Sequence, residues 1–373
     1  MARENSSFIP LFLLFLSLFL CFFPYNCCCS NNNGVDQIKG MFVFGSSLVD
    51  NGNNNFILDN SAKANYFPYG IDFPFGPTGR FTNGKNVIDL LCERLMLPFI
   101  PRFADPLTRG SKIIHGVNFA SAASGILDST GLIAGNVITL NEQMRNFEEV
   151  TLPELEAQLG CKSAQSLPQY LFVVGTGGND YSFNYFLNPN GNTSLEAFTA
   201  NLTLTLSQKI KRLYSLGGRT FIVISINPIG CSPMIKINKP TQSGCVEEMN
   251  RAAQLFNRQL MSFVDSSKQE MPFSTLVFVN SYQILNDILQ NPSSQGFEEA
   301  SRPCCEVPSL SEGGNGVLCK RGGQACENRR NHVYFDGLHP SEAVNIQIAT
   351  KAFLSPLKTE VYPINIKQLA NIV

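Results

Sequence analysis

The residues with the clearest chemical potential lie near the C-terminus, where Asp336 precedes His339 by three positions. The chain has only three histidines, and an Asp that holds a His ring is the usual means of making a serine hydroxyl nucleophilic at neutral pH. Two candidate serines, Ser46 and Ser47, lie near the N-terminal end of the chain, directly after a strand-like run that ends in Gly45. These residue types and spacings predict nucleophilic chemistry at a serine.

The elements that would position these residues alternate between strands and helices. Short β-branched or aromatic runs predict strands at Met41–Phe44, Ile113–Phe119, Tyr170–Val174, Thr220–Ile226 and Thr275–Val279. Helical patterns occupy Asn86–Leu97, Ser194–Leu216, Val246–Gln269 and Ser341–Phe353. This alternation predicts an α/β fold with a mainly parallel, five-stranded sheet and helices on both faces.

Small polar residues follow several of these strands, in the runs that begin at Gly45, Gly175 and Asn227. Ligands of open parallel sheets bind at the carboxyl ends of the strands, so these residues are expected at the rim of a site. A serine between a strand and a helix would also lie near a helix N-terminus, where backbone N–H groups favour a developing oxyanion.

The composition argues against a disordered chain and against a nucleic-acid-binding protein. Hydrophobic residues make up 44% of the 373 residues, which is ordinary globular composition. Charged residues make up only 15%, and the formal net charge is -1, so the basic surface of a nucleic-acid-binding protein is not expected.

The N-terminus predicts secretion. Arg3 precedes an apolar run from Phe8 to Phe23, which is short for a membrane span and suits a signal peptide. Cleavage is expected among Cys27, Cys28, Cys29 and Ser30, which leaves residues 30–373 as a single domain with no stable membrane anchor. An uncleaved anchor is the alternative.

In an oxidising compartment the remaining cysteines are expected to form disulfides. They are an even eight: Cys92, Cys161, Cys231, Cys245, Cys304, Cys305, Cys319 and Cys326. The last four crowd a Gly-rich stretch before Asp336 and are expected to staple that loop, while Cys231 and Cys245 would close another. A zinc site is the competing idea, but no CxxC pair supports it, and no metal is expected. Asn192 and Asn201 begin N-glycosylation tripeptides.

Five blocks, in order, resemble those of the plant GDSL esterase/lipase branch of the SGNH hydrolases. They are Gly45-Ser46-Ser47-Leu48 with its continuation Val49–Asn54, Gly79–Gly84, Gly116–Gly125, Gly177–Tyr181, and Asp336–Glu342, with Cys304-Cys305 between the last two. The resemblance covers essentially the whole mature chain. It implies a three-layer α/β/α sandwich and hydrolysis of ester bonds, with an ester as the substrate and no cofactor.

Carried over position by position, the resemblance implies a role for each site residue. Ser47 would be the nucleophile, His339 the general base and then acid, and Asp336 the residue that orients His339. The Asn179 side chain and the backbone N–H groups of Ser47 and Ala123 would form the oxyanion hole.

One position departs from the family pattern, because Ser46 stands where the GDSL block has Asp. Ser46 can make only neutral, weaker hydrogen bonds in the nucleophile turn. A binding protein on a silenced hydrolase scaffold therefore stays open as an alternative. Acyl transfer to an alcohol, which would use the same catalytic residues as hydrolysis, is another. Asp50 and Asp180 are expected to stabilise turns. Arg80 is expected to anchor loops, with a place at the entrance for the acyl group as the alternative.

Overall fold

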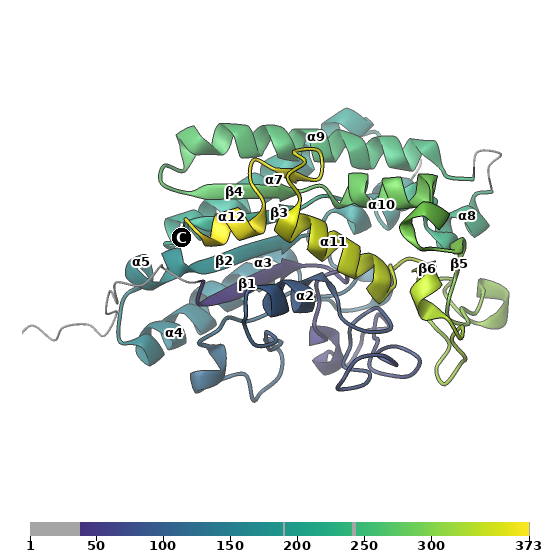
Figure 1. Cartoon of the computed structure of the whole chain (residues 1–373), viewed down its shortest axis with the longest axis horizontal. Coiled ribbons are helices and arrows are strands. Elements are labelled where there is room, and N and C mark those ends of the chain that lie inside the picture. The colour runs from purple at the N-terminus through teal and green to yellow at the C-terminus, as the bar shows by residue number, and fades with distance from the viewer. Residues whose placement is uncertain (1–37, 189–190, 241–243, 373) are drawn as a thin grey trace, which may run out of the picture.

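The computed structural model describes residues 38–188, 191–240 and 244–372, and the region predicted to hold the signal peptide and its cleavage site lies outside these ranges. Four parallel strands form the centre of the fold, in the spatial order of the chain: β1 (Gly40–Gly45), β2 (Tyr170–Gly175), β3 (Thr220–Ile224) and β4 (Thr275–Val279). A fifth strand, β7 (Val361–Tyr362), pairs antiparallel with β4. The predicted five-stranded, mainly parallel sheet is confirmed (Figure 1).

The two faces of the sheet bury alternate residues of each strand, as the two-residue period of a strand requires. Phe42 and Phe44 of β1 belong to one apolar cluster, and Met41 and Val43 belong to the other. The first cluster packs against α3 (Leu140–Arg145), α4 (Leu152–Leu159), α7 (Leu195–Ser215) and α9 (Glu247–Glu270). The second packs against α2 (Val87–Arg94), α10 (Ser281–Gln290), α11 (Glu342–Leu354) and α12 (Ile366–Ala370).

The result is a three-layer α/β/α sandwich. Helices α11 and α12 cross in front of the sheet in Figure 1. Strands covered on both faces must be apolar throughout, which explains why β1 to β4 are nearly continuous hydrophobic runs. No helix within the described ranges is long and apolar enough to cross a membrane.

The helices α2, α7, α9 and α11 begin and end close to the predicted residues, and α2 and α7 begin at side-chain caps. Asn86 caps α2 by accepting from the Asp89 N–H, and Asp89 in turn accepts from the Asn86 N–H. Ser194 caps α7 by accepting from the Ala197 N–H. Such side-chain caps satisfy N–H groups that the first turn of a helix leaves unpaired.

The predicted strand at Ile113–Phe119 is wrong. Residues Gly110–Ile113 form the 3₁₀ helix η2, and Gly116 adopts φ 100°. Beyond this turn the chain runs beside β1 and exchanges backbone hydrogen bonds with it, since Phe119 donates to the Val43 carbonyl at 2.8 Å and Val43 donates to the Val117 carbonyl at 3.1 Å. Its bridges at Asn118 are isolated, so no strand forms. The segment is apolar because it is buried, and burial alone does not make a strand.

The strands β5 (Glu299–Pro303) and β6 (His332–Tyr334) form a small second sheet, separate from the five-stranded one. Three short helices complete the described α-helices: α5 (Ser163–Ser166), α6 (Gly178–Ser182) and α8 (Pro233–Asn238). A third apolar cluster joins two disulfides to aromatic residues of the loops, including Tyr69, Phe81 and Phe335. This cluster supports the loop that carries His339.

Candidate active site

Ser47 lies in a turn that follows β1 at the carboxyl edge of the sheet. Gly45 and Gly175 end β1 and β2 side by side, and the Ser46 N–H donates to the Gly175 carbonyl at 3.0 Å. Gly45 has φ 143°, and a Cβ there would lie 2.1 Å from the Gly175 oxygen, so this exit from the strand requires glycine. The next helical element along the chain is the 3₁₀ helix η1 (Asn53–Phe56). The predicted helix N-terminus at the nucleophile is therefore wrong.

His339 joins Ser47 to Asp336 through its two ring nitrogens. Its Nε2 lies 2.8 Å from Ser47 Oγ, and its Nδ1 lies 2.8 Å from Asp336 Oδ2. All three side chains are buried, with Asp336 wholly inaccessible. The Phe335 N–H donates to the His339 carbonyl at 2.8 Å, and this tight loop turns the carboxylate back toward the ring. An Asp in this place fixes the tautomer that leaves Nε2 able to accept a proton.

Asp336 is itself held by three donors besides the imidazole. The Leu338 and His339 N–H groups donate to Oδ1 at 2.8 and 2.7 Å, and the Tyr69 hydroxyl donates to Oδ2 at 2.7 Å. Burial and the adjacent Asp336 charge raise the pKa of Tyr69 well above its ordinary value, which keeps this hydroxyl protonated. No pattern in the sequence identifies Tyr69, which lies between the blocks Gly45–Asn54 and Gly79–Gly84.

The Gly79–Gly84 block fixes the other side of the histidine loop. The Phe81 ring lies 4.9 Å from the His339 ring, centroid to centroid. The Thr82 hydroxyl donates to the Pro340 carbonyl at 3.1 Å, and Asn83 accepts from the N–H of Glu342, the first residue of α11, at 2.9 Å. The imidazole is therefore packed on one face by an aromatic ring and bonded at its edges.

The residues predicted to stabilise an oxyanion lie in two loops that touch. Asn179 in α6 donates through Nδ2 to the Ser124 carbonyl at 2.9 Å, which leaves its second amide hydrogen available. The backbone N–H groups of Ser47 and Ala123 have no hydrogen-bond partner in the described chain. Ala123 adopts a left-handed conformation with φ 68°. Unpaired N–H donors of this kind are what an oxyanion hole requires.

Asp180 connects these two loops. Its carboxylate accepts from the N–H groups of Ile126 and Leu127 at 2.8 and 3.0 Å and from the Thr130 hydroxyl at 2.7 Å. Burial raises the pKa of Asp180 to about 6, against the opposing effect of these donors. The predicted turn-stabilising role is confirmed, and it fixes Asn179 relative to the loop of Ala123.

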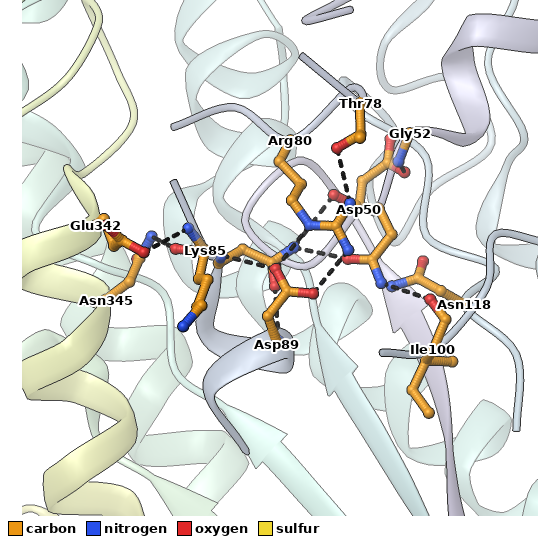
Figure 2. A network of polar contacts seen from close by, with 12 residues as sticks. Asp50, Gly52, Thr78, Arg80, Lys85, Asp89, Ile100, Asn118, Glu342 and Asn345 are labelled. Carbon is orange, nitrogen blue, oxygen red and sulfur yellow. Dashed lines mark hydrogen bonds and ion pairs between the residues drawn. The ribbon is translucent and has the colours of Figure 1, made fainter. Parts of the chain in front are cut away.

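Asp50 stabilises the turn that carries Ser47 and connects it to the loop of Ala123. It accepts from the Gly52 N–H at 2.6 Å and from the Ala122 N–H at 3.0 Å, and burial raises its pKa to about 6. Arg80 lies beside it and forms a two-pronged ion pair with Asp89, through Nε at 2.6 Å and Nη2 at 2.7 Å (Figure 2). Arg80 is buried and does not line the cavity at Ser47, which confirms that it anchors loops.

Gln143 of α3 lies in the helical layer that packs against Phe42 and Phe44, and it hydrogen-bonds to the end of β1. Its Oε1 accepts from the Gly45 N–H at 2.8 Å, and its Nε2 donates to the Gly45 carbonyl at 3.0 Å. The same Nε2 reaches Ser124 Oγ at 3.3 Å. This buried amide joins the nucleophile turn to the loop of Ala123, and nothing in the sequence around Gln143 identifies it.

Ser46 contributes its backbone to the turn but not its side chain. The Ser46 hydroxyl lines the cavity at Ser47 and makes no hydrogen bond to the described residues. The neutral hydrogen bonds expected of it are therefore not formed. Gly45, Asp50 and Gln143 hold the turn without it.

The described disulfides are Cys231–Cys245, Cys304–Cys326 and Cys305–Cys319, and Cys161 is also disulfide-bonded. The expectation that all eight cysteines are paired is wrong at Cys92. This residue is a free thiol wholly buried in the apolar layer of α2, and burial raises its pKa. Cys304, Cys326 and His332 lie close enough to suggest a metal site, but the two sulfurs are bonded to each other.

A narrow cavity of about 80 Å³ opens at Ser47 and follows the carboxyl ends of the strands. Asn179 and His339 line it, together with residues from both helical layers, and no Asp, Glu, Lys or Arg of the described chain does. A cavity that reaches the nucleophile and is lined by apolar and neutral polar side chains suits an uncharged part of a substrate.

His332 and the two asparagines predicted to carry glycans do not line the cavity at Ser47. The His332 Nδ1 lies 3.1 Å from the Asn328 carbonyl oxygen, which can only accept a hydrogen bond. The side chains of Asn192 and Asn201 are exposed, before and within α7.

The sequence matches the model of the GDSL-like lipase/acylhydrolase family over residues 41–352. The chain belongs to this family. A GDSL esterase/lipase of Arabidopsis thaliana is 39% identical over 345 residues, which cover 90% of each chain. Another from the same plant is 40% identical over 347 residues, covering 90% of this chain and 88% of the relative. By family, the protein is a carboxylic ester hydrolase.

One solved structure is also similar, a catalytic mutant of an acetylxylan esterase from Geobacillus stearothermophilus. It is 12% identical with a TM-score of 0.36, and the match covers 84% of this chain and 92% of that one.

Proposed function

We propose that the protein is a secreted serine esterase or lipase that hydrolyses carboxylic esters through an acyl-enzyme on Ser47. The observation that carries the proposal is the continuous line of hydrogen bonds from Ser47 through His339 to Asp336, with distances of 2.8 Å at both ring nitrogens. A serine in such a line is activated without a metal or organic cofactor.

In the first half of the reaction, Ser47 Oγ attacks the ester carbonyl while its proton moves to His339 Nε2. Asp336 stabilises the imidazolium that forms. The negative charge on the carbonyl oxygen is met by the Asn179 amide and by the backbone N–H groups of Ser47 and Ala123. The tetrahedral intermediate then collapses, the bond to the alcohol oxygen breaks, and His339 returns its proton to that oxygen.

In the second half, water replaces the alcohol. His339 takes a proton from the water as its oxygen attacks the acyl carbon, and the same donors hold the second oxyanion. Collapse releases the carboxylic acid and returns the proton to Ser47 Oγ. Every proton transfer passes through one nitrogen, which is why the rigid packing around His339 matters to both halves.

The silenced-scaffold alternative depended on Ser46. The side chain of Ser46 makes no hydrogen bond to the described residues, while Gly45, Asp50 and Gln143 hold the turn. This favours an intact enzyme. No specific observation favours acyl transfer to an alcohol over transfer to water.

We further propose that residues 1–29 are a signal peptide, that a single domain begins at residue 30, and that Asn192 and Asn201 carry glycans. The disulfides support an oxidising destination, because such bonds rarely persist in the cytosol. Exposure of both asparagines is compatible with modification.

Hydrolysis of p-nitrophenyl esters, from acetate to palmitate, tests the proposal with purified protein beside its Ser47→Ala variant. We expect turnover that the variant loses almost entirely. Equal turnover by the two proteins, or none by either with the fold intact, would overturn the proposed function.

A further inference from the structure

The edge of β1 that faces away from β2 carries backbone hydrogen bonds whose regular pattern is interrupted at Gly45. The Val43 N–H donates to the Val117 carbonyl at 3.1 Å. Because parallel ladders are evenly spaced, the Gly45 N–H would next pair with the Phe119 carbonyl. It donates instead to Gln143 Oε1, at 2.8 Å. A side-chain amide therefore takes the place of a backbone carbonyl just before the chain turns toward the nucleophile.

Gln143 bonds the peptide groups on both sides of the Gly45 Cα. Besides accepting from the N–H, it donates through Nε2 to the Gly45 carbonyl and to the Ile138 carbonyl, each at 3.0 Å. Gly45 has φ 143°, in a region that glycine alone adopts readily, and glycine is the residue with the most conformational freedom to lose. Two bonds from one planar amide fix the rotation of the chain two positions before Ser47.

The same amide reaches the loop that carries Ala123. Its Nε2 lies 3.3 Å from Ser124 Oγ, and this hydroxyl oxygen lies 3.1 Å from the Gly45 carbonyl oxygen. The Ser124 carbonyl in turn accepts from Asn179 Nδ2 at 2.9 Å. Through Gly45 and Ser124, Gln143 is therefore connected to the segments that carry all three donors of the proposed oxyanion hole.

Gln143 does not contact the space that a substrate would occupy. Its side chain is wholly buried, and it does not line the cavity at Ser47. Any effect of Gln143 on the reaction must therefore pass through the backbone that it holds. Oxyanion donors act at ~2.7–3.1 Å from the charged oxygen, and a displacement of ~1 Å costs ~10²-fold in rate. The spacing of the donors thus affects the rate as strongly as their presence.

We propose that Gln143 is a positioning residue for the oxyanion hole, which holds the turn of Ser47 and the loop of Ala123 at the spacing that the transition state requires. This proposal rests on the proposed function. A residue that only supports the fold affects stability. A positioning residue also lowers kcat while KM holds, because the carbonyl oxygen of the bound ester has not yet developed the charge that the donors stabilise.

The Gln143→Met variant keeps the length of the side chain and removes its hydrogen bonds. With p-nitrophenyl butyrate we expect kcat to fall by about 10–100-fold and KM to stay within about twofold. The ketone 1,1,1-trifluoropentan-2-one, to which Ser47 adds to give a negatively charged hemiketal, should lose affinity by about the same factor as kcat/KM. A folded Gln143→Met variant with the kcat of the wild-type protein would overturn the proposal.

Asn365→Leu is the matched control for stability. The buried Asn365 amide also bonds two backbone groups, because it accepts from the Gln368 N–H at 2.9 Å and donates to the Ser355 carbonyl at 3.1 Å. These residues do not line the cavity at Ser47. Both variants should lower the melting temperature, and only Gln143→Met should lower kcat. An equal loss of kcat in the two variants would show that destabilisation alone explains the effect, and the positioning role would be rejected.

Ser124→Ala decides the matter if Gln143→Met does not fold. It removes one contact of the amide, so kcat should fall by about twofold to tenfold, and an unchanged kcat would refute the link between the two loops.

Absence of turnover by the wild-type protein would reject the proposed function. The rate at which a fluorophosphonate labels Ser47 then judges Gln143 alone, because phosphonylation also places negative charge on an oxygen in the hole. Slower labelling of Gln143→Met is required, and equal rates refute the positioning role.

Discussion

Replacing Tyr69 with Phe removes one hydroxyl from the support of the histidine and leaves the aromatic ring in place. Asp336 Oδ1 keeps both of its backbone donors, but Oδ2 keeps only the imidazole. The Asp336 carboxylate then has one hydrogen bond fewer to fix the rotation of its plane. The Cys319 N–H, which donates to the Tyr69 oxygen at 3.1 Å, also loses its acceptor.

A hydrogen bond to a charged group contributes ~1.5–3 kcal/mol. If the hydrogen bond from Tyr69 stabilises only the transition state in which the His339 imidazolium forms, its loss lowers kcat/KM by about 10–160-fold, since each ~1.4 kcal/mol is a factor of ten. We expect a loss in this range for p-nitrophenyl butyrate, carried by kcat rather than KM because Tyr69 does not line the cavity.

Tyr66→Phe is the matched control. The Tyr66 ring lies 5.4 Å from that of Tyr69, and its hydroxyl donates to the Cys319 carbonyl at 2.9 Å without reaching Asp336. Both variants should lower the melting temperature, and only Tyr69→Phe should lower kcat substantially. Equal values of kcat in the two variants would show that the Tyr69 hydroxyl stabilises the loop of Cys319 and does not affect catalysis through Asp336.

Three further outcomes are expected. Asn179→Ala should lower kcat by ~10²–10³, measured with p-nitrophenyl butyrate, and an unchanged kcat would remove Asn179 from the oxyanion hole. Ser46→Ala should change kcat/KM by only about twofold, because the hydroxyl makes no hydrogen bond to the described residues; a loss as large as that of Ser47→Ala would show that the wrong serine was chosen. For Asp180, folding raises the pKa from 3.8 to about 6, so the native state gains stability as pH falls below 6 and loses it as pH rises. Asp180→Asn cannot titrate, so urea unfolding should show it more destabilising at pH 4.5 than at pH 7.5, by ~2 kcal/mol, and a reversed order would contradict this.

The sheet and the reacting residues could be predicted because they leave short-range signals. Buried parallel strands are continuous apolar runs, and helix caps mark their own boundaries, as at Asn86 and Ser194. The pair Asp336 and His339 is recognisable from its spacing alone. The structure brings Ser47 to this pair across 292 positions of sequence, a closeness that no local pattern can reveal.

Other features leave no such signal. Tyr69 reaches Asp336 across 267 positions, and a lone tyrosine has no spacing to identify it. The strand β7 has two residues, too few for a period to be read. Segment 113–119 has the composition of a strand, which core residues share wherever they lie, and only the left-handed turn at Gly116 distinguishes it from one. A count of cysteines cannot distinguish Cys92, a free thiol within α2, from the cysteines that form disulfides.

The central claim, that Ser47 is activated by His339, is tested most directly by covalent labelling with a fluorophosphonate, which reports an activated serine without the natural substrate. The labelled site is located by peptide mass spectrometry in the folded wild-type protein and in the Ser47→Ala and His339→Ala variants. The account predicts one adduct, on Ser47, that is absent from the first variant and nearly absent from the second. A folded wild-type protein that stays unlabelled, or that is labelled on another residue, would contradict it.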